Sequence, residues 1–142
     1  MTFTAQTGTP LTARVVGAPG NVAQGINGAL RADYLGGPVQ ESDPTIGRFF
    51  NTAAFAVPAP GVFGDSARNM ITGPGGRQLN LSLVRDVPLG GNRAVTMQVN
   101  ATNLLNDVQW AFVDTNLNSP TFGQVLSVRP MRTVTLTARL RF

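Results

Sequence analysis

The last eleven residues alternate between apolar and polar side chains, and this pattern constrains the fold more than any other part of the chain. Residues 132–142 place Val134, Leu136, Ala138, Leu140 and Phe142 at one parity, and Thr133, Thr135, Thr137, Arg139 and Arg141 at the other. A period of two indicates a β-strand with one apolar and one polar face. About ten residues is the length a tilted strand needs to cross a bilayer, and a final aromatic side chain is typical of an interfacial girdle.

Three further segments show the same alternation, at residues 2–16, 77–87 and 93–103. Gly8 and Pro10 interrupt the first of them, because glycine and proline weaken a strand interior. In the third segment Gln98 and Asn100 share the polar parity. We therefore predict an all-β, antiparallel, up-and-down arrangement of four strands. The polar parities, with Gln98, Asn100 and the polar residues of 132–142, are predicted to face a wet barrel lumen.

The apolar parities carry few charges, since Arg77, Arg85, Arg93 and Arg132 all fall near the ends of the predicted strands. Such a face suits lipid, in which an arginine at mid-depth would cost about 2–4 kcal/mol. A soluble β-sandwich would show the same alternation with its polar face in bulk water. The alternation alone does not separate these two architectures.

The lengths of the connections give the predicted strands a direction. Residues 17–76 and 104–131 form two long loops rich in glycine and proline, whereas the turn from Pro88 to Asn92 is short. Outer-membrane barrels have long outer loops and short periplasmic turns. We therefore expect both long loops outside the cell and Phe142 at the periplasmic side.

The composition argues against several classes of function. Cysteine and histidine are absent, and all eleven positive charges are scattered arginines that exceed the acids by four. We expect no cofactor, no metal, no catalysis and no nucleic-acid partner, because such sites need clustered ligands, acid–base groups or a basic groove.

Two short motifs resemble ligand-binding loops only in part. The Asp114-Thr-Asn116-Leu-Asn118 segment starts like a calcium loop, but Ser119 and Val125 stand where that loop needs glycine and glutamate. The Gly73-to-Gly76 segment lacks the lysine of a phosphate loop. We expect ordinary turns at both places, and no catalytic pair among Asp33, Glu41, Asp43 and Asp65. The aromatic residues Phe49, Phe50, Trp110 and Phe112 are expected in a girdle or a loop core.

A set of short motifs resembles the C-terminal region of TonB-dependent outer-membrane receptors. The resemblance is closest to the Oar-like group, whose members carry a carboxypeptidase-regulatory-like domain. The motifs are Phe49–Phe55, Val57-Pro58, Pro60-Gly61, Phe63-Gly64, Arg68-Asn69, Gly73–Gly75, Asn103–Asn106, Ser119–Gly123 and the terminal strand. This family implies a plugged barrel of 22 strands in the outer membrane of a Gram-negative bacterium, and a role in nutrient uptake.

The resemblance also implies partners. The terminal residues Leu136, Ala138, Leu140 and Phe142 resemble the signal that the barrel-assembly machinery reads, although Thr137 replaces its frequent glycine. Outer-membrane lipid is expected on the apolar face. Four strands do not close a barrel, so we expect the rest of a barrel, or another chain, to pair the open strand edges.

Two other readings remain open at this point. The chain could be a separately made strand-pairing module that assembles into an oligomer or filament, or a soluble β-sandwich binding domain. Solubility without detergent distinguishes both of these from a membrane barrel.

Overall fold

A computed structural model describes residues 1–16 and 30–142 of the chain and divides it into two compact units. The sheet unit comprises Met1–Gln6, Gly76–Gln109 and Arg129–Phe142. The loop unit comprises Thr7–Gly75 and Trp110–Val128. The first long loop predicted from the sequence, residues 17–76, lies partly outside the described residues, because it includes residues 17–29.

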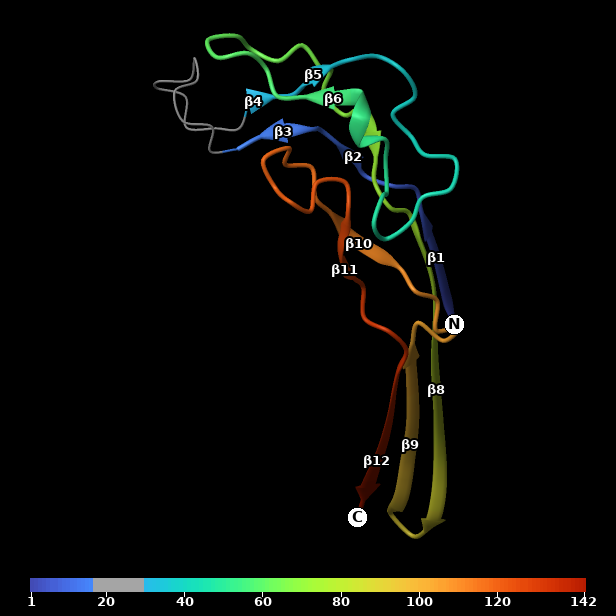
Figure 1. Cartoon of the computed structure of the whole chain (residues 1–142). Helices are drawn as coiled ribbons and strands as arrows, with labels where there is room; N and C mark the ends of the chain where they lie inside the picture. The colour runs from blue at the N-terminus through green and yellow to red at the C-terminus, as the bar shows by residue number, and fades with distance from the viewer. Residues whose placement is uncertain (17–29) are drawn as a thin grey trace. The chain divides into compact units, whose positions relative to one another are not determined.

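The sheet unit is a single antiparallel sheet of four strands (Figure 1). Its strands are β1 (Thr2–Gln6), β8 (Gly76–Gly90), β9 (Arg93–Thr102) and β12 (Thr133–Arg141), and they lie in that order. Each strand therefore pairs with the next along the chain among these four, which is an up-and-down topology. The predicted all-β antiparallel fold is confirmed. No helix in the described ranges has the length and hydropathy needed to span a membrane.

The pairing along β8 is staggered. Its first residues pair with β1 through Thr2 opposite Asn80, whereas its pairing with β9 starts one residue later, at Leu81 opposite Ala101. The terminal strand β12 pairs with β9 along its whole length, from Thr133 opposite Thr102 to Arg141 opposite Ala94. Stagger of this kind is required when a sheet closes into a barrel.

The β8–β9 turn comes later than the sequence indicated. Backbone pairing continues to Gly90 opposite Arg93, and only Gly91 and Asn92 connect the strands. Gly90 and Gly91 have φ values of 95° and 61°, a region that glycine occupies without steric cost. The predicted strand over 77–87 thus extends to Gly76–Gly90.

The predicted strand over residues 2–16 does not run unbroken. It ends at Gln6, and β2 (Pro10–Leu11) and β3 (Arg14–Val15) follow as separate short strands of the loop unit. A Cβ atom on Gly8 would lie 1.7 Å from the carbonyl oxygen of Gly73. The backbone of this segment therefore passes close to another part of its own unit instead of continuing the sheet.

The Asn103–Asn106 motif has a clear structural role in the sheet unit. Asn103 and Asn106 adopt φ values of 49° and 57°, which end β9, and left-handed φ is tolerated best by asparagine after glycine. The Asn103 side chain bonds the backbone of Asp107 in both directions, at 3.0 and 3.1 Å. The Asn106 side chain accepts the Arg132 N–H at 3.1 Å, just before β12.

The loop unit has its own apolar core, although most of it, residues 17–75 and 110–128, was predicted as loop. Its short pairs are β2 with β7 (Ile71–Thr72), β3 with β4 (Leu30–Arg31), β5 (Asp33–Tyr34) with β6 (Phe55–Ala56), and β10 (Trp110–Val113) with β11 (Val125–Val128). A 3₁₀ turn, η1 (Thr52–Ala54), precedes β6.

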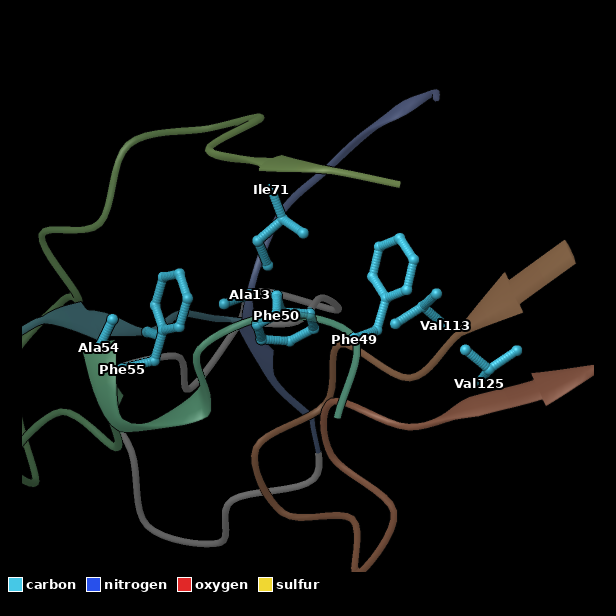
Figure 2. Close-up of a cluster of buried hydrophobic side chains, with 9 residues drawn as sticks. Ala13, Phe49, Phe50, Ala54, Phe55, Ile71, Val113 and Val125 are labelled. Atoms are coloured by element: carbon cyan, nitrogen blue, oxygen red, sulfur yellow. The ribbon is translucent and has the colours of Figure 1, made fainter. Parts of the chain in front are cut away.

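Aromatic side chains fill the centre of that core (Figure 2). Phe50 is fully buried and makes edge-on contacts with Phe55 and Phe122, at centroid distances of 6.0 and 5.3 Å. Phe49 packs edge-on against Trp110 at 5.8 Å. Phe49, Phe50 and Trp110 thus belong to a loop core, one of the two places expected for them, whereas Phe112 is 58% exposed.

Candidate functional site: the two faces of the sheet

Most apolar and polar side chains of the sheet unit lie on opposite faces, and the register of the four strands keeps these faces aligned, although Val84 lies on the polar face, opposite Gln98. Leu83 lies opposite Val99, and Val99 lies opposite Leu136. The same face continues through Phe3 opposite Leu79. Because paired residues point to the same side of a sheet, one continuous apolar face results.

This apolar face is exposed in the described part of the chain. Its large side chains include Phe3, Leu83, Met97, Val134, Leu136, Leu140 and Phe142, with exposed fractions from 44% to 89%. A contiguous apolar surface of this size in a soluble monomer would be unusual. We therefore expect lipid or protein to cover this face.

The height of the apolar face fits a bilayer. The distance along β8 from Leu79 to Leu89 is roughly 33 Å at 3.3 Å per residue. A strand tilted by about 40° covers roughly 25 Å of membrane with that length, which is the height of the apolar band of outer-membrane barrels. The face has the dimension that the lipid interpretation requires.

Arg85 corrects one expectation from the sequence. Because β8 extends to Gly90, Arg85 does not lie near the strand end but within the apolar face, opposite Met97. It is exposed, and no ion pair to it forms among the described residues. By contrast, Arg77 on the same face pairs with Asp107 at 2.9 Å. Arg85 can meet a polar interface only by extending its side chain along the strand.

The polar face contains the residues that the sequence predicted to face a lumen. Register places Thr135 opposite Asn100 and Thr137 opposite Gln98. Arg139 lies opposite Thr96, and Arg141 lies opposite Ala94. Together with Thr133, these side chains share one face of the sheet; that this face borders a lumen stays a prediction.

Hydrogen bonds join side chains of the polar face both between strands and along one strand. Ser82 of β8 donates to Asn100 of β9 at 2.7 Å, and Gln98, which is also on β9, donates to the same oxygen at 3.2 Å. One step along, Thr96 donates to Asp86 at 2.5 Å. The side chains are thus held by one another in fixed positions, which is what a wall that presents polar groups to water or a ligand requires.

Two features of this face were not predicted as site residues. Among the residues that the structure describes, Asp86 is the one acid on this face; it lies opposite Thr96, which in turn lies opposite Arg139. Asp86 and Ser82 are separated by an even number of residues along β8, and this spacing in the sequence could have placed Asp86 on the polar face. The second feature is a small polar pocket of about 40 Å³, and it is lined by Thr4, Gln6, Gly76, Gln78, Gln109 and Arg129. The pocket depends on the fold around Gly76, where a Cβ would lie 2.8 Å from the Gln109 side-chain oxygen.

The Asp114–Asn118 segment of the loop unit forms turns. The Asp114 carboxylate accepts the Asn116 N–H at 2.9 Å and the Thr121 hydroxyl at 2.7 Å. The Asn116 side chain accepts the Asn118 N–H at 3.2 Å. These oxygens are engaged by donors of the chain itself, and no group of three potential metal-ligating side chains occurs in the described residues.

The same donors alter the acidity of Asp114. Burial raises the pKa of this carboxyl, but hydrogen bonds from Ser119, Asn116 and Thr121 lower it more, so that the pKa lies below its ordinary value of 3.8. A depressed folded-state pKa stabilises the fold above the unfolded-state pKa, and this stabilisation is lost as pH falls through the folded-state pKa.

We therefore expect Asp114→Asn to make the loop unit less stable at neutral pH and to change it less below about pH 4. Urea unfolding of both forms at pH 7 and pH 3, followed by fluorescence of the single tryptophan, Trp110, measures this. A destabilisation of equal size at both pH values would show that the carboxylate charge contributes nothing.

Three of the four acids of the first long loop, Asp33, Glu41 and Asp65, have partners within the described part of the chain. Asp33 accepts the Asp65 N–H at 3.3 Å, and Asp65 accepts the Tyr34 N–H at 2.8 Å. Glu41 pairs with Arg48 at 3.1 Å. Each of these contacts is explained by a structural role, and none of them requires a catalytic one.

One comparison with known proteins gives a match. A family model described as an outer membrane beta barrel domain matches residues 1–135. No curated protein and no solved structure matches the chain. The family match covers nearly all of both units. It agrees with the antiparallel strands, with the apolar and polar faces of the sheet and with the height of the apolar face. The chain belongs to the outer membrane β-barrel domain family, and its family implies a location in the outer membrane.

Proposed function

We propose that this chain is the C-terminal barrel segment of a TonB-dependent receptor-like protein in a Gram-negative outer membrane. In this proposal the segment has a structural and ligand-gating role in nutrient uptake and is not an enzyme. The apolar face contacts lipid, and the polar face borders the lumen. The motifs between Phe49 and Phe142 that resemble this receptor group support it, and the family match supports the barrel.

The observation that carries the proposal is the agreement of register and alternation across four strands. A single strand with two faces could arise in many folds. Here Leu83, Val99 and Leu136 form one row on one face, and Ser82, Asn100 and Thr135 form the next row on the other. Rows of this kind in every strand are what a barrel wall between lipid and water needs.

The open edges of the sheet support the proposed partner. Beyond Asn80, no described strand pairs with β8 on the side of β1, and none pairs with the outer edge of β12. The segment from Leu81 to Gly90 thus presents unpaired backbone groups, which in lipid would cost several kcal/mol each. We propose that other barrel strands, or a second chain, pair with both edges.

The strand-pairing module is the second candidate, because the same open edges would allow assembly in water. Purification without detergent separates the candidates. We expect the chain to need detergent or lipid to stay dispersed. A detergent-free monomer would contradict the membrane role, and ordered assemblies in water would favour the module.

Phe142 tests the proposed role of the terminal strand in assembly. Its side chain is 89% exposed in the sheet unit. Its transfer into lipid is worth roughly 1.5–3 kcal/mol, which is about 10- to 160-fold in an equilibrium constant. We expect deletion of Phe142 to lower the folded fraction of the full-length receptor in the outer membrane. Heat-modifiability on gels measures that fraction, and an unchanged fraction would refute the assembly signal.

A further inference from the structure

The loop unit contains a pocket of about 320 Å³. Residues from two distant parts of the chain line it, among them Leu11 and Arg14 from the first part and Phe112 and Asn116 from the second. Its volume lies at the lower end of the range for pockets that bind small molecules, about 300–1,000 Å³. All of its lining residues belong to the loop unit.

Arg14 supplies a positive charge to this pocket. Its backbone is fixed, because its N–H donates to Thr115 at 2.9 Å and its carbonyl accepts the Leu117 N–H at 2.8 Å. Its side chain is exposed, and no carboxylate within the described residues lies within 4.0 Å of it. The backbone of Arg14 is thus fixed beside the pocket that the residue lines, and its side chain has no carboxylate partner among the described residues.

The residue opposite Arg14 strengthens this argument. Arg14 pairs with Arg31 across β3 and β4, and like charges directly opposite each other are unfavourable. Arg31 donates to the Ser66 carbonyl at 2.7 Å, so its guanidinium has a partner. Asp114 also lines the pocket and carries a negative charge, but both of its oxygens already accept hydrogen bonds, and among the described residues no ion pair joins it to Arg14. An external anion would therefore give the Arg14 guanidinium the partner that it lacks there.

Phe112 supplies the apolar half of the pocket. It lies on β10 and is 58% exposed, unlike the aromatic side chains of the loop core. A phenyl ring is a flat surface on which another ring can stack. A pocket with one guanidinium and one free ring suits a ligand that carries an anionic group and a ring.

We propose that this pocket binds a small ring-bearing anion, with a carboxylate or phosphate group at Arg14 and the ring against Phe112. Planar guanidinium groups bind both anions through paired hydrogen bonds, which makes the two chemically equivalent here. The proposal goes beyond the uptake role, because binding is measurable whether or not the chain takes part in transport.

Titration calorimetry on the full chain in detergent tests the proposal with four probes. Phenyl phosphate and benzoate combine the ring with each anion, whereas inorganic phosphate and phenol offer one half each. We expect saturable binding of a ring-bearing anion, about tenfold tighter than of either half. Comparison of phenyl phosphate with benzoate identifies the preferred anion.

Matched variants locate the site. Arg14→Gln and Phe112→Ala should each weaken binding by about tenfold. The controls make the same chemical changes at exposed positions that do not line the pocket, Arg68→Gln and Phe63→Ala, and should bind as the parent does. Trp110 fluorescence confirms that each variant is folded. Absence of saturable binding, or equal losses in the controls, would overturn the proposal.

Discussion

Replacing Leu136 with arginine will destabilise the membrane-inserted barrel by about 2–4 kcal/mol. Leu136 lies on the apolar face, opposite Val99, and is 68% exposed in the sheet unit. It is roughly 15 Å from the level of Phe142 at 3.3 Å per residue and a 40° tilt, which is close to mid-depth of the apolar band. An arginine there has to leave water without gaining a partner.

The matched control is the neighbouring position on the same strand. Thr135→Arg adds the same side chain to the polar face, opposite Asn100, and we expect a change within about 0.5 kcal/mol. Urea unfolding of the receptor in lipid vesicles measures both values. Equal destabilisation by the two arginines would mean that the two faces do not meet different solvents.

Replacing Phe50 with alanine will unfold or strongly loosen the loop unit. Phe50 is fully buried and contacts both Phe55 and Phe122, so truncation leaves a cavity among rings. Such truncations cost about 3–5 kcal/mol. The single tryptophan, Trp110, belongs to this unit and packs on Phe49, so its fluorescence reports the loss.

Phe63→Ala provides the control, because Phe63 belongs to the same unit but is 55% exposed. We expect its unfolding midpoint to stay close to that of the parent. If both variants unfold at the same denaturant concentration, the buried ring cluster does not stabilise the loop unit.

The sheet could be predicted from the sequence because the alternation of apolar and polar residues is visible within each strand. In β9 and β12 each residue shows by its parity which face it occupies, and the cross-strand register follows once the β8–β9 turn is placed. The prediction for Arg85 was wrong because of that turn: with two glycines at positive φ, β8 extends three residues beyond the predicted strand end, to Gly90. The residues expected on the lumen side share one face for the same reason.

The loop unit could not be predicted in the same way. Its strands are only two to four residues long, too short for a period to appear. Leu11 pairs with Ile71, and Arg14 bridges to Asn116, so the contacts join residues far apart in the chain. The Arg14–Phe112 pocket depends on these contacts and has no signal in any one segment.

The accessibility of spin labels along β12 tests the central claim most directly. Single labels are placed at Val134, Thr135, Leu136, Thr137 and Ala138 of the barrel in lipid vesicles, and collisions with oxygen and with a water-soluble nickel complex are measured. We predict alternation with a period of two, in which labels at Val134, Leu136 and Ala138 favour oxygen and labels at the threonines favour nickel. Equal access of the nickel complex to all five positions would contradict a strand between lipid and lumen.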